Sequence, residues 1–160
     1  MSGETRYPDS RNPNSIQHGL EFQDLITDCL REHGLYVQNY SSRKYQLDKG
    51  ENVQGWEIKY DSWCTKSGRL SIEVEERTAL DRPWVKSGIY SGKSWLYIQG
   101  NEQRFWVFFT SFLRQLHQSG RYAEKDDNPA TIKTFYLPMA DADKYGHRVD
   151  VAQEEQEPAF

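Results

Sequence analysis

Hydrophobic residues recur with two different periods along the chain, and each period predicts one type of element. In 15–34 ("SIQHGLEFQDLITDCLREHG") they recur every three or four residues, which predicts an amphipathic helix that ends at Gly34. A second helical pattern covers 110–120. Strict alternation in 56–63 and 70–78 predicts two strands, each with one apolar face and one charged face.

The other segments add further strands to this pattern. Strand character is present in 35–42, and two strongly apolar segments, 94–100 and 104–110, predict a pair of strands joined at a turn. The stretch 120–133 is typical of a loop, while 134–146 predicts a last strand followed by a short helix. The order predicts a mixed α/β (α+β) fold with a central mixed β-sheet of four to five strands flanked by helices.

Chain length and composition bound the domain organisation. The chain has 160 residues, of which 36% are hydrophobic and 14% aromatic, so it can build the core of one domain. We expect this domain to span 15–150. Residues 1–14 are rich in Pro, Asn, Ser and Arg, and residues 151–160 are acidic, so both ends are predicted to be flexible tails.

The net charge and the two cysteines limit the partners and the cellular compartment that we expect for this protein. A net charge of −4 argues against an evenly basic nucleic-acid coat but leaves room for a local basic face. Cys29 and Cys64 form no CxxC motif, which favours a reducing compartment. No signal-peptide pattern and no apolar run of about 18 residues is present, so we expect a soluble, cytoplasmic protein without a membrane partner.

The charged faces of 56–63 and 70–78 pair well if the two strands form a hairpin. A turn centred on Ser67 sets Glu57 opposite Arg77 and Lys59 opposite Glu75. Opposite charges across a sheet stabilise it by roughly 0.2–1 kcal/mol a pair. Ordinary sheet chemistry therefore accounts for these four residues.

The third pair of that hairpin places two acids together. Asp61 lies opposite Glu73, with Cβ atoms roughly 5 Å apart, so one carboxyl is protonated, both turn to water, or a divalent cation binds between them. Glu21, at the edge of the first helix, can supply a third carboxylate. Oxygen ligands beside Lys59, with no His or Cys cluster, suit Mg²⁺ or Mn²⁺ and not Zn²⁺.

These residues resemble the PD-(D/E)xK nuclease superfamily, whose pattern is an Asp on one strand, an acid on the next and a Lys two positions later. The matching region is roughly 17–118: the helix with Glu21, the strand with Asp61 and "IEVEE" with Glu73. The stretches "GWEIKYD", "LSIEVEE" and "SGIYSGKSWLYIQGN" are similar to small phage-type endonucleases of this superfamily. The resemblance implies a restriction-endonuclease-like fold and Mg²⁺-dependent hydrolysis of DNA, with Mn²⁺ able to substitute.

The resemblance also implies a site. Its metal ligands would be Asp61, Glu73, Glu75 and Glu21, with Lys59 orienting the attacking water.

Two departures from the superfamily pattern bear on this assignment. Tyr60 stands in the place of the Pro, and Glu75 occupies the position of the Lys, as an acid does in some restriction-type members. Lys59 can take over the role of that lysine. A second assignment reads Glu57-Ile58-Lys59 as the motif itself, with Asp48 upstream.

Candidate DNA contacts lie in a basic and aromatic loop after the second charged strand and in a second basic stretch. The loop offers Arg82, Trp84, Lys86, Ser87 and Lys93, and the second stretch offers Arg43 and Lys44. Trp84 has an alternative role as a core ring.

Three functions compete at this point. The first is a Mg²⁺-dependent endonuclease acting on double-stranded or branched DNA, as a homodimer by analogy with nucleases of this size. The second is a noncatalytic nucleic-acid-binding relative with the same fold. The third is an acidic protein-interaction or inhibitor module, suggested by the net charge and the acidic end of the chain.

Overall fold

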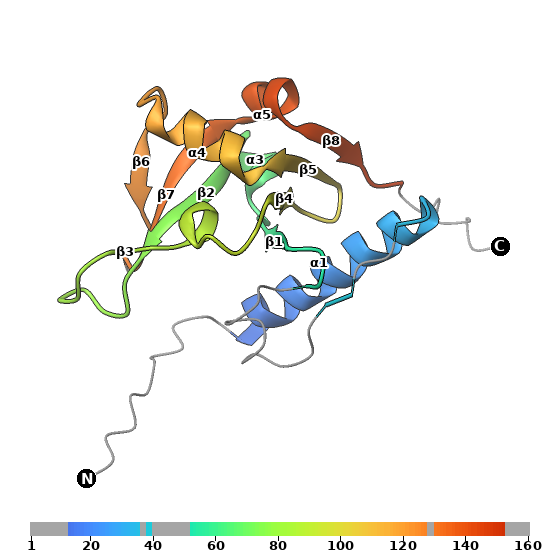
Figure 1. Ribbon diagram of the computed structural model, residues 1–160, viewed down its shortest axis with the longest axis horizontal. Coiled ribbons are helices and arrows are strands. Elements are labelled where there is room, and N and C mark those ends of the chain that lie inside the picture. Colours follow the sequence, from blue (N-terminus) through green and yellow to red (C-terminus); the bar gives the residue numbers. More distant parts are fainter. Residues whose placement is uncertain (1–12, 36–37, 40–51, 128–129, 153–160) are drawn as a thin grey trace, which may run out of the picture.

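The computed structural model describes residues 13–35, 38–39, 52–127 and 130–152, and it confirms the mixed α and β character of the chain (Figure 1). The helices and strands are α1 (Pro13–Glu32), β1 (Trp56–Tyr60), α3 (Cys64–Ser67), β2 (Arg69–Glu76), β3 (Val85–Lys86), the 3-10 helix η1 (Gly88–Tyr90), β4 (Leu96–Gly100), β5 (Arg104–Phe109), α4 (Thr110–Gln118), β6 (Glu124–Asp126), β7 (Ile132–Pro138), α5 (Met139–Tyr145) and β8 (His147–Asp150).

The strands form two four-stranded sheets in place of the one central sheet of four to five strands that the sequence predicts. One sheet has the order β1-β4-β5-β8, with β1 parallel to β4 and the other neighbours antiparallel. The other has the order β3-β2-β7-β6 and is antiparallel throughout. The predicted pairing of 94–100 with 104–110 is confirmed as β4 and β5.

The predicted hairpin between 56–63 and 70–78 is wrong. β1 pairs with β4, whereas β2 pairs with β7 and β3. The predicted turn is the short helix α3, which ends at Gly68 with a left-handed φ of 71°. The apolar faces explain the difference, because Ile58 of β1 and Ile72 of β2 lie in two separate hydrophobic clusters.

The hydrophobic core therefore has two parts. The larger cluster includes Leu70, Ile72 and Val74 of β2, inward residues of β4 and β5, and Leu113 and Leu116 of α4. The smaller cluster lies between the first sheet and α1, where Phe22 and Ile26 are buried against Ile58, Ile98 and Phe105. In Figure 1, α1 lies along this sheet on the side away from α4.

The boundaries of α1 differ slightly from the prediction. The helix begins at Pro13, two residues before the predicted start, and Gly34 follows its end with a left-handed φ of 79°, as predicted. Of the predicted strand 35–42, the described residues include Asn39, which forms an isolated bridge with Asn52. Residues 36–37 and 40–42 of that strand lie outside the described residues, as do residues 1–12 of the predicted tail 1–14 and residues 153–160 of the predicted tail 151–160.

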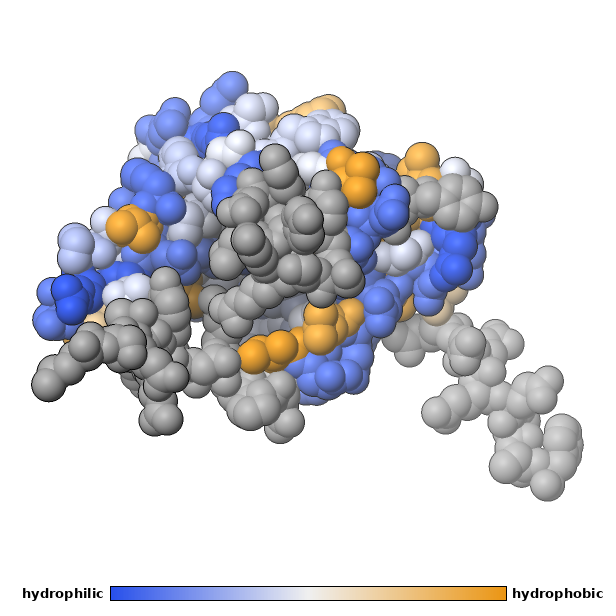
Figure 2. Space-filling view, turned by 60° about the horizontal axis from the view of Figure 1, so that its bottom comes forward, coloured by the Kyte–Doolittle hydropathy of each residue, from blue (hydrophilic) through white to orange (hydrophobic). Residues whose placement is uncertain are grey.

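Three short strands were not predicted. β3 and β6 contain only exposed residues, and β8 is exposed except at Val149, so none carries the alternation of buried and exposed residues that predicts a strand. On the face drawn in Figure 2, hydrophilic residues predominate and hydrophobic residues stand in small separate groups. None of the described helices combines the length and apolar character that crossing a bilayer requires.

We expect the packing of α1 to contribute measurably to stability. Ile26 is fully buried, so Ile26→Ala should lower the free energy of unfolding by about 2–5 kcal/mol in urea titrations followed by circular dichroism. Ile16 lies on the same helix but is 42% exposed, so Ile16→Ala should cost less than about 1 kcal/mol. Equal losses from the two substitutions would contradict this packing.

Candidate active site

Three charged side chains from the two sheets meet at the end of β1. The Lys59 ammonium lies 3.0 Å from Oε1 of Glu57 on the same strand and 3.7 Å from Oε2 of Glu73 on β2. The exposed fractions of the Glu57 and Glu73 side chains are 15% and 17%, and that of Lys59 is 33%. One cation therefore lies between two largely buried carboxylates.

Alternation along both strands brings this group together. Because Ile58 packs against α1, its neighbours Glu57 and Lys59 must point to the other face of β1. Because Ile72 and Val74 of β2 are buried in the larger cluster, Glu73 between them points away from it. The charged faces of β1 and β2 thus approach each other although the strands are not paired.

Gly88 permits η1 to pack directly on β2 beside Glu73. A Cβ on Gly88 would lie 2.2 Å from the backbone oxygen of Glu73, and Gly88 has a left-handed φ of 52°. The preceding Ser87 donates its backbone N–H to the Val74 carbonyl at 3.1 Å. Contact between η1 and β2 holds the backbone on which Glu73 stands.

Asp61 links the two sheets instead of facing Glu73 in a ladder. Its backbone N–H donates to the Gly100 carbonyl at 2.7 Å. Its Oδ2 accepts hydrogen bonds from the Ser71 backbone N–H at 3.0 Å and from Nε2 of Gln99 at 2.9 Å. Gln99 Nε2 also donates to the Ser71 carbonyl at 2.9 Å. The like-charge contact predicted for Asp61 and Glu73 is therefore replaced by a bridge of hydrogen bonds.

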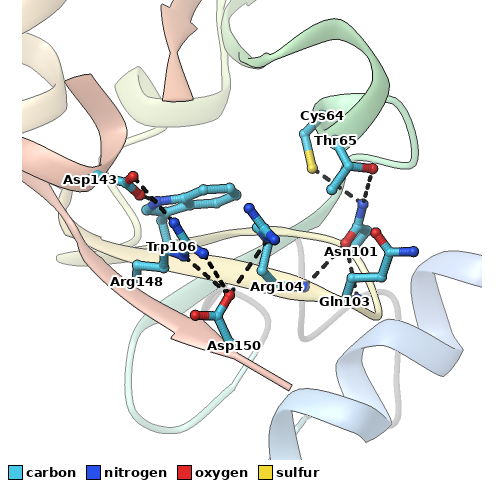
Figure 3. A network of polar contacts seen from close by, with 9 residues as sticks. All are labelled: Cys64, Thr65, Asn101, Gln103, Arg104, Trp106, Asp143, Arg148 and Asp150. Atoms are coloured by element: carbon cyan, nitrogen blue, oxygen red, sulfur yellow. Dashed lines mark hydrogen bonds and ion pairs between the residues drawn. The ribbon is translucent and has the colours of Figure 1, made fainter. Parts of the chain in front are cut away.

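A second polar group fixes the chain that follows Asp61 (Figure 3). Nδ2 of the buried Asn101 lies 3.4 Å from Sγ of Cys64 and 3.3 Å from Oγ1 of Thr65 at the start of α3. Its Oδ1 accepts two backbone N–H groups of the turn between β4 and β5. Burial raises the pKa of the Cys64 thiol to about 12, so this thiol is neutral at physiological pH. Both Cys64 and Cys29 are free thiols.

Figure 3 also shows how β8 is attached at the far edge of the first sheet. Asp143 of α5 accepts a hydrogen bond from the indole of Trp106 at 2.8 Å and lies 3.3 Å from the Arg148 guanidinium. Arg148 also pairs with Asp150 at 3.1 Å. These contacts join α5, β5 and β8.

Glu75 was predicted as a metal ligand, but its two carboxylate oxygens form ion pairs with two lysines. Its Oε1 lies 2.9 Å from Lys86 Nζ and its Oε2 lies 3.0 Å from Lys133 Nζ. The two ammonium groups hold the pKa of the Glu75 carboxyl below its usual value. The predicted pairing of Lys59 with Glu75 is wrong, because Lys59 pairs with Glu57 and Glu73 instead.

Glu21, the other predicted ligand, lies on the opposite side of β1. It accepts a hydrogen bond from Gln17 at 3.0 Å and lines a hollow together with Tyr60 and Glu102. Burial and the Glu102 carboxylate, which accepts a hydrogen bond from the phenol, raise the pKa of Tyr60 to about 12. Since Tyr60 and Lys59 point to opposite faces of β1, Glu21 does not join the Lys59 group.

The predicted DNA contacts are distributed over several environments. The Trp84 ring contacts two cations, with its centroid 4.3 Å from the Arg77 guanidinium and 4.5 Å from the Lys133 ammonium. Ser87 is buried, while Arg82, Lys86 and Lys93 are exposed. Arg43, Lys44 and Asp48 lie outside the described residues.

Sequence reasoning missed Gln99. Tyr97, Ile98, Gln99 and Gly100 of β4 are all buried, and a polar residue inside a buried strand was the available signal. Among the described residues, no group of three or more His, Cys, Asp or Glu side chains is placed to hold a metal ion.

Comparisons of the chain with protein-family models, with curated proteins and with solved structures found no match.

The two ion pairs of Glu75 predict a specific dependence of stability on pH. A carboxyl with a lowered pKa stabilises the fold above its usual pKa of 4.5 and loses this contribution as the pH falls through the lowered value. Glu75→Gln should therefore lower the free energy of unfolding by about 1 kcal/mol at pH 7. The difference from the wild type should shrink below pH 4.5 in urea titrations repeated across the pH range.

Glu76→Gln is the matched control, because Glu76 is an exposed carboxyl at the end of the same strand. It should change the free energy of unfolding by less than about 0.5 kcal/mol at every pH. A Glu75→Gln effect that stays constant down to pH 2 would contradict the role of the ion pairs.

Proposed function

We propose that this protein is a metal-dependent nuclease that hydrolyses phosphodiester bonds of DNA. The observation that carries the proposal is the Lys59 ammonium, which lies 3.0 Å from Glu57 and 3.7 Å from Glu73, two largely buried carboxylates. Glu57 and Lys59 stand in the Glu-x-Lys order of the PD-(D/E)xK pattern, so the proposal takes the second of the two sequence assignments. Asp48, the upstream acid of that assignment, lies outside the described residues.

The donor set around Lys59 fits Mg²⁺ or Mn²⁺. Both ions prefer carboxylate oxygens, and Mg²⁺ in phosphoryl-transfer sites is held by one or two carboxylates, with water and substrate phosphate completing the shell. Glu57 and Glu73 supply two such carboxylates from neighbouring sheets. When bound, the ion would polarise the scissile phosphate and lower the pKa of a coordinated water.

Lys59 and Asp61 have separate roles in the proposed reaction. The Lys59 ammonium orients the attacking water and offsets the negative charge that grows on the phosphate oxygens as the water oxygen bonds to phosphorus. The P–O bond to the leaving nucleotide then breaks, its oxygen takes up a proton, and the attacking water loses one to solvent. Asp61 acts as a positioning residue, since its hydrogen bonds to Ser71 and Gln99 hold β2 against β4.

The proposal keeps two of the roles expected from the sequence and changes others. Glu73 remains a metal ligand and Lys59 remains the cation beside the water. Glu57 replaces Asp61 as the second ligand. Glu75 positions Lys86 and Lys133, which are candidate contacts for the DNA backbone together with the ring of Trp84. A homodimer able to cut two strands belongs to the same proposal.

A cleavage assay tests the proposed function. Supercoiled, linear single-stranded and branched DNA are incubated with the protein in Mg²⁺, Mn²⁺ or chelator. We expect cleavage that stops in chelator and falls at least about 100-fold in Lys59→Ala, Glu57→Gln and Glu73→Gln, because each removes a charge from the reacting centre. Glu76→Gln and Glu102→Gln remove carboxylates outside the site and should retain full activity.

Other outcomes identify the competing functions. Binding of DNA without cleavage in either metal ion would favour the noncatalytic relative. Neither binding nor cleavage would favour the acidic interaction module. Full activity of Lys59→Ala would refute the assignment of the site.

A further inference from the structure

The side-chain oxygen of Gln99 has no hydrogen-bond partner within the described part of the chain. The residue is 2% exposed. Its Nε2 donates to Oδ2 of Asp61 and to the carbonyl of Ser71, each at 2.9 Å. Because both of these groups only accept hydrogen bonds, the nitrogen and the oxygen of the amide are assigned without ambiguity. The buried Oε1 accepts no hydrogen bond from any described residue.

An unpaired amide oxygen at this depth is costly, since burial removes the water that would otherwise bind it. An apolar side chain of similar volume would fill the space without that cost. The amide nitrogen alone accounts for the contacts to Asp61 and Ser71. The oxygen therefore requires a hydrogen-bond donor or a cation that belongs to neither residue.

The position of Gln99 in the sheet places this residue beside Lys59 of the proposed site. Gln99 is paired in register with Lys59 in the parallel β1–β4 ladder, so the two side chains lie on the same face of the sheet. Its contact at Ser71 lies two residues before Glu73 on the same face of β2. The amide is thus enclosed by the same two strands that carry Glu57, Lys59 and Glu73.

We infer that Oε1 of Gln99 accepts a hydrogen bond from a water molecule that hydrates the divalent cation held by Glu57 and Glu73. This inference rests on the proposed function. Mg²⁺ and Mn²⁺ retain several of their waters in such sites, and each of these waters needs an acceptor. Gln99 is then an outer ligand that orients the hydrated ion, while its nitrogen fixes the position of Asp61.

Binding of Mn²⁺ to the full chain, measured by electron paramagnetic resonance without DNA, tests this inference. Gln99→Met removes the oxygen and the nitrogen, and it should weaken Mn²⁺ binding by at least about tenfold. Gln99→Glu also loses the nitrogen but keeps an acceptor oxygen, and it should bind Mn²⁺ at least as tightly as the wild type.

Asn101→Leu is the matched control, because Asn101 is a buried amide with both of its ends bonded. It should destabilise the fold, as measured by urea unfolding in chelator, without changing the affinity for Mn²⁺. This separates a loss of stability from a loss of the ligand.

The outcomes distinguish this inference from the proposed function. If the wild type binds no Mn²⁺, both fail. If the wild type and Gln99→Met bind Mn²⁺ equally, the role of Gln99 is overturned while the proposed nuclease site stands. If Gln99→Met does not fold, Gln99→Glu decides, and weaker Mn²⁺ binding by that variant than by the wild type refutes the inference.

Discussion

The parallel pairing of β1 with β4 is the constraint on which the rest of the structure depends. It separates β1 from β2, its neighbour in the sequence, and places the two strands in different sheets. One face of β1 is thereby closed by α1, and the other is turned toward β2. The same register sets Lys59 beside Gln99, so the ladder that builds the sheet also determines which polar groups share its interior.

Periodicity predicted which segments form elements and which residues share a face, but it could not predict which elements pair. The helices α1 and α4, which have strong periods, and the strands β4 and β5, which lie in strongly apolar segments, follow their predictions. The hairpin of β1 and β2 failed because alternation fixes the two faces of a strand and says nothing about its partner. Favourable charge pairs such as Lys59 with Glu75 made the local pairing plausible, whereas the burial of Ile58 and Ile72 in separate clusters decided against it.

Part of the candidate site could be predicted from the sequence, because alternation shows which residues of a strand share a face. Lys59 and Glu73 were both singled out, since charged residues on strands with one apolar face must gather on the other face. The contact between Lys59 and Glu73 joins the two sheets. It depends on how the sheets pack, which the spacing of residues in the sequence does not predict. Glu75 was assigned to the site because it follows Glu73 by two positions. Its lysine partner Lys133 is 58 residues away in the sequence and joins it only when β7 pairs with β2.

The order of strands in the first sheet also has a consequence for how the chain is made. β1 needs β4, and the last strand of that sheet, β8, comes from residues 147–150. While the chain is being synthesised, α1 and β1 therefore have no completed sheet to cover their apolar residues until β4 and β5 have emerged. Contacts between residues so far apart in the sequence slow folding and leave apolar surface exposed during it. Two members of the Glu57, Lys59 and Glu73 group therefore stand on a strand, β1, whose partner in the sheet lies about 40 residues further along the chain.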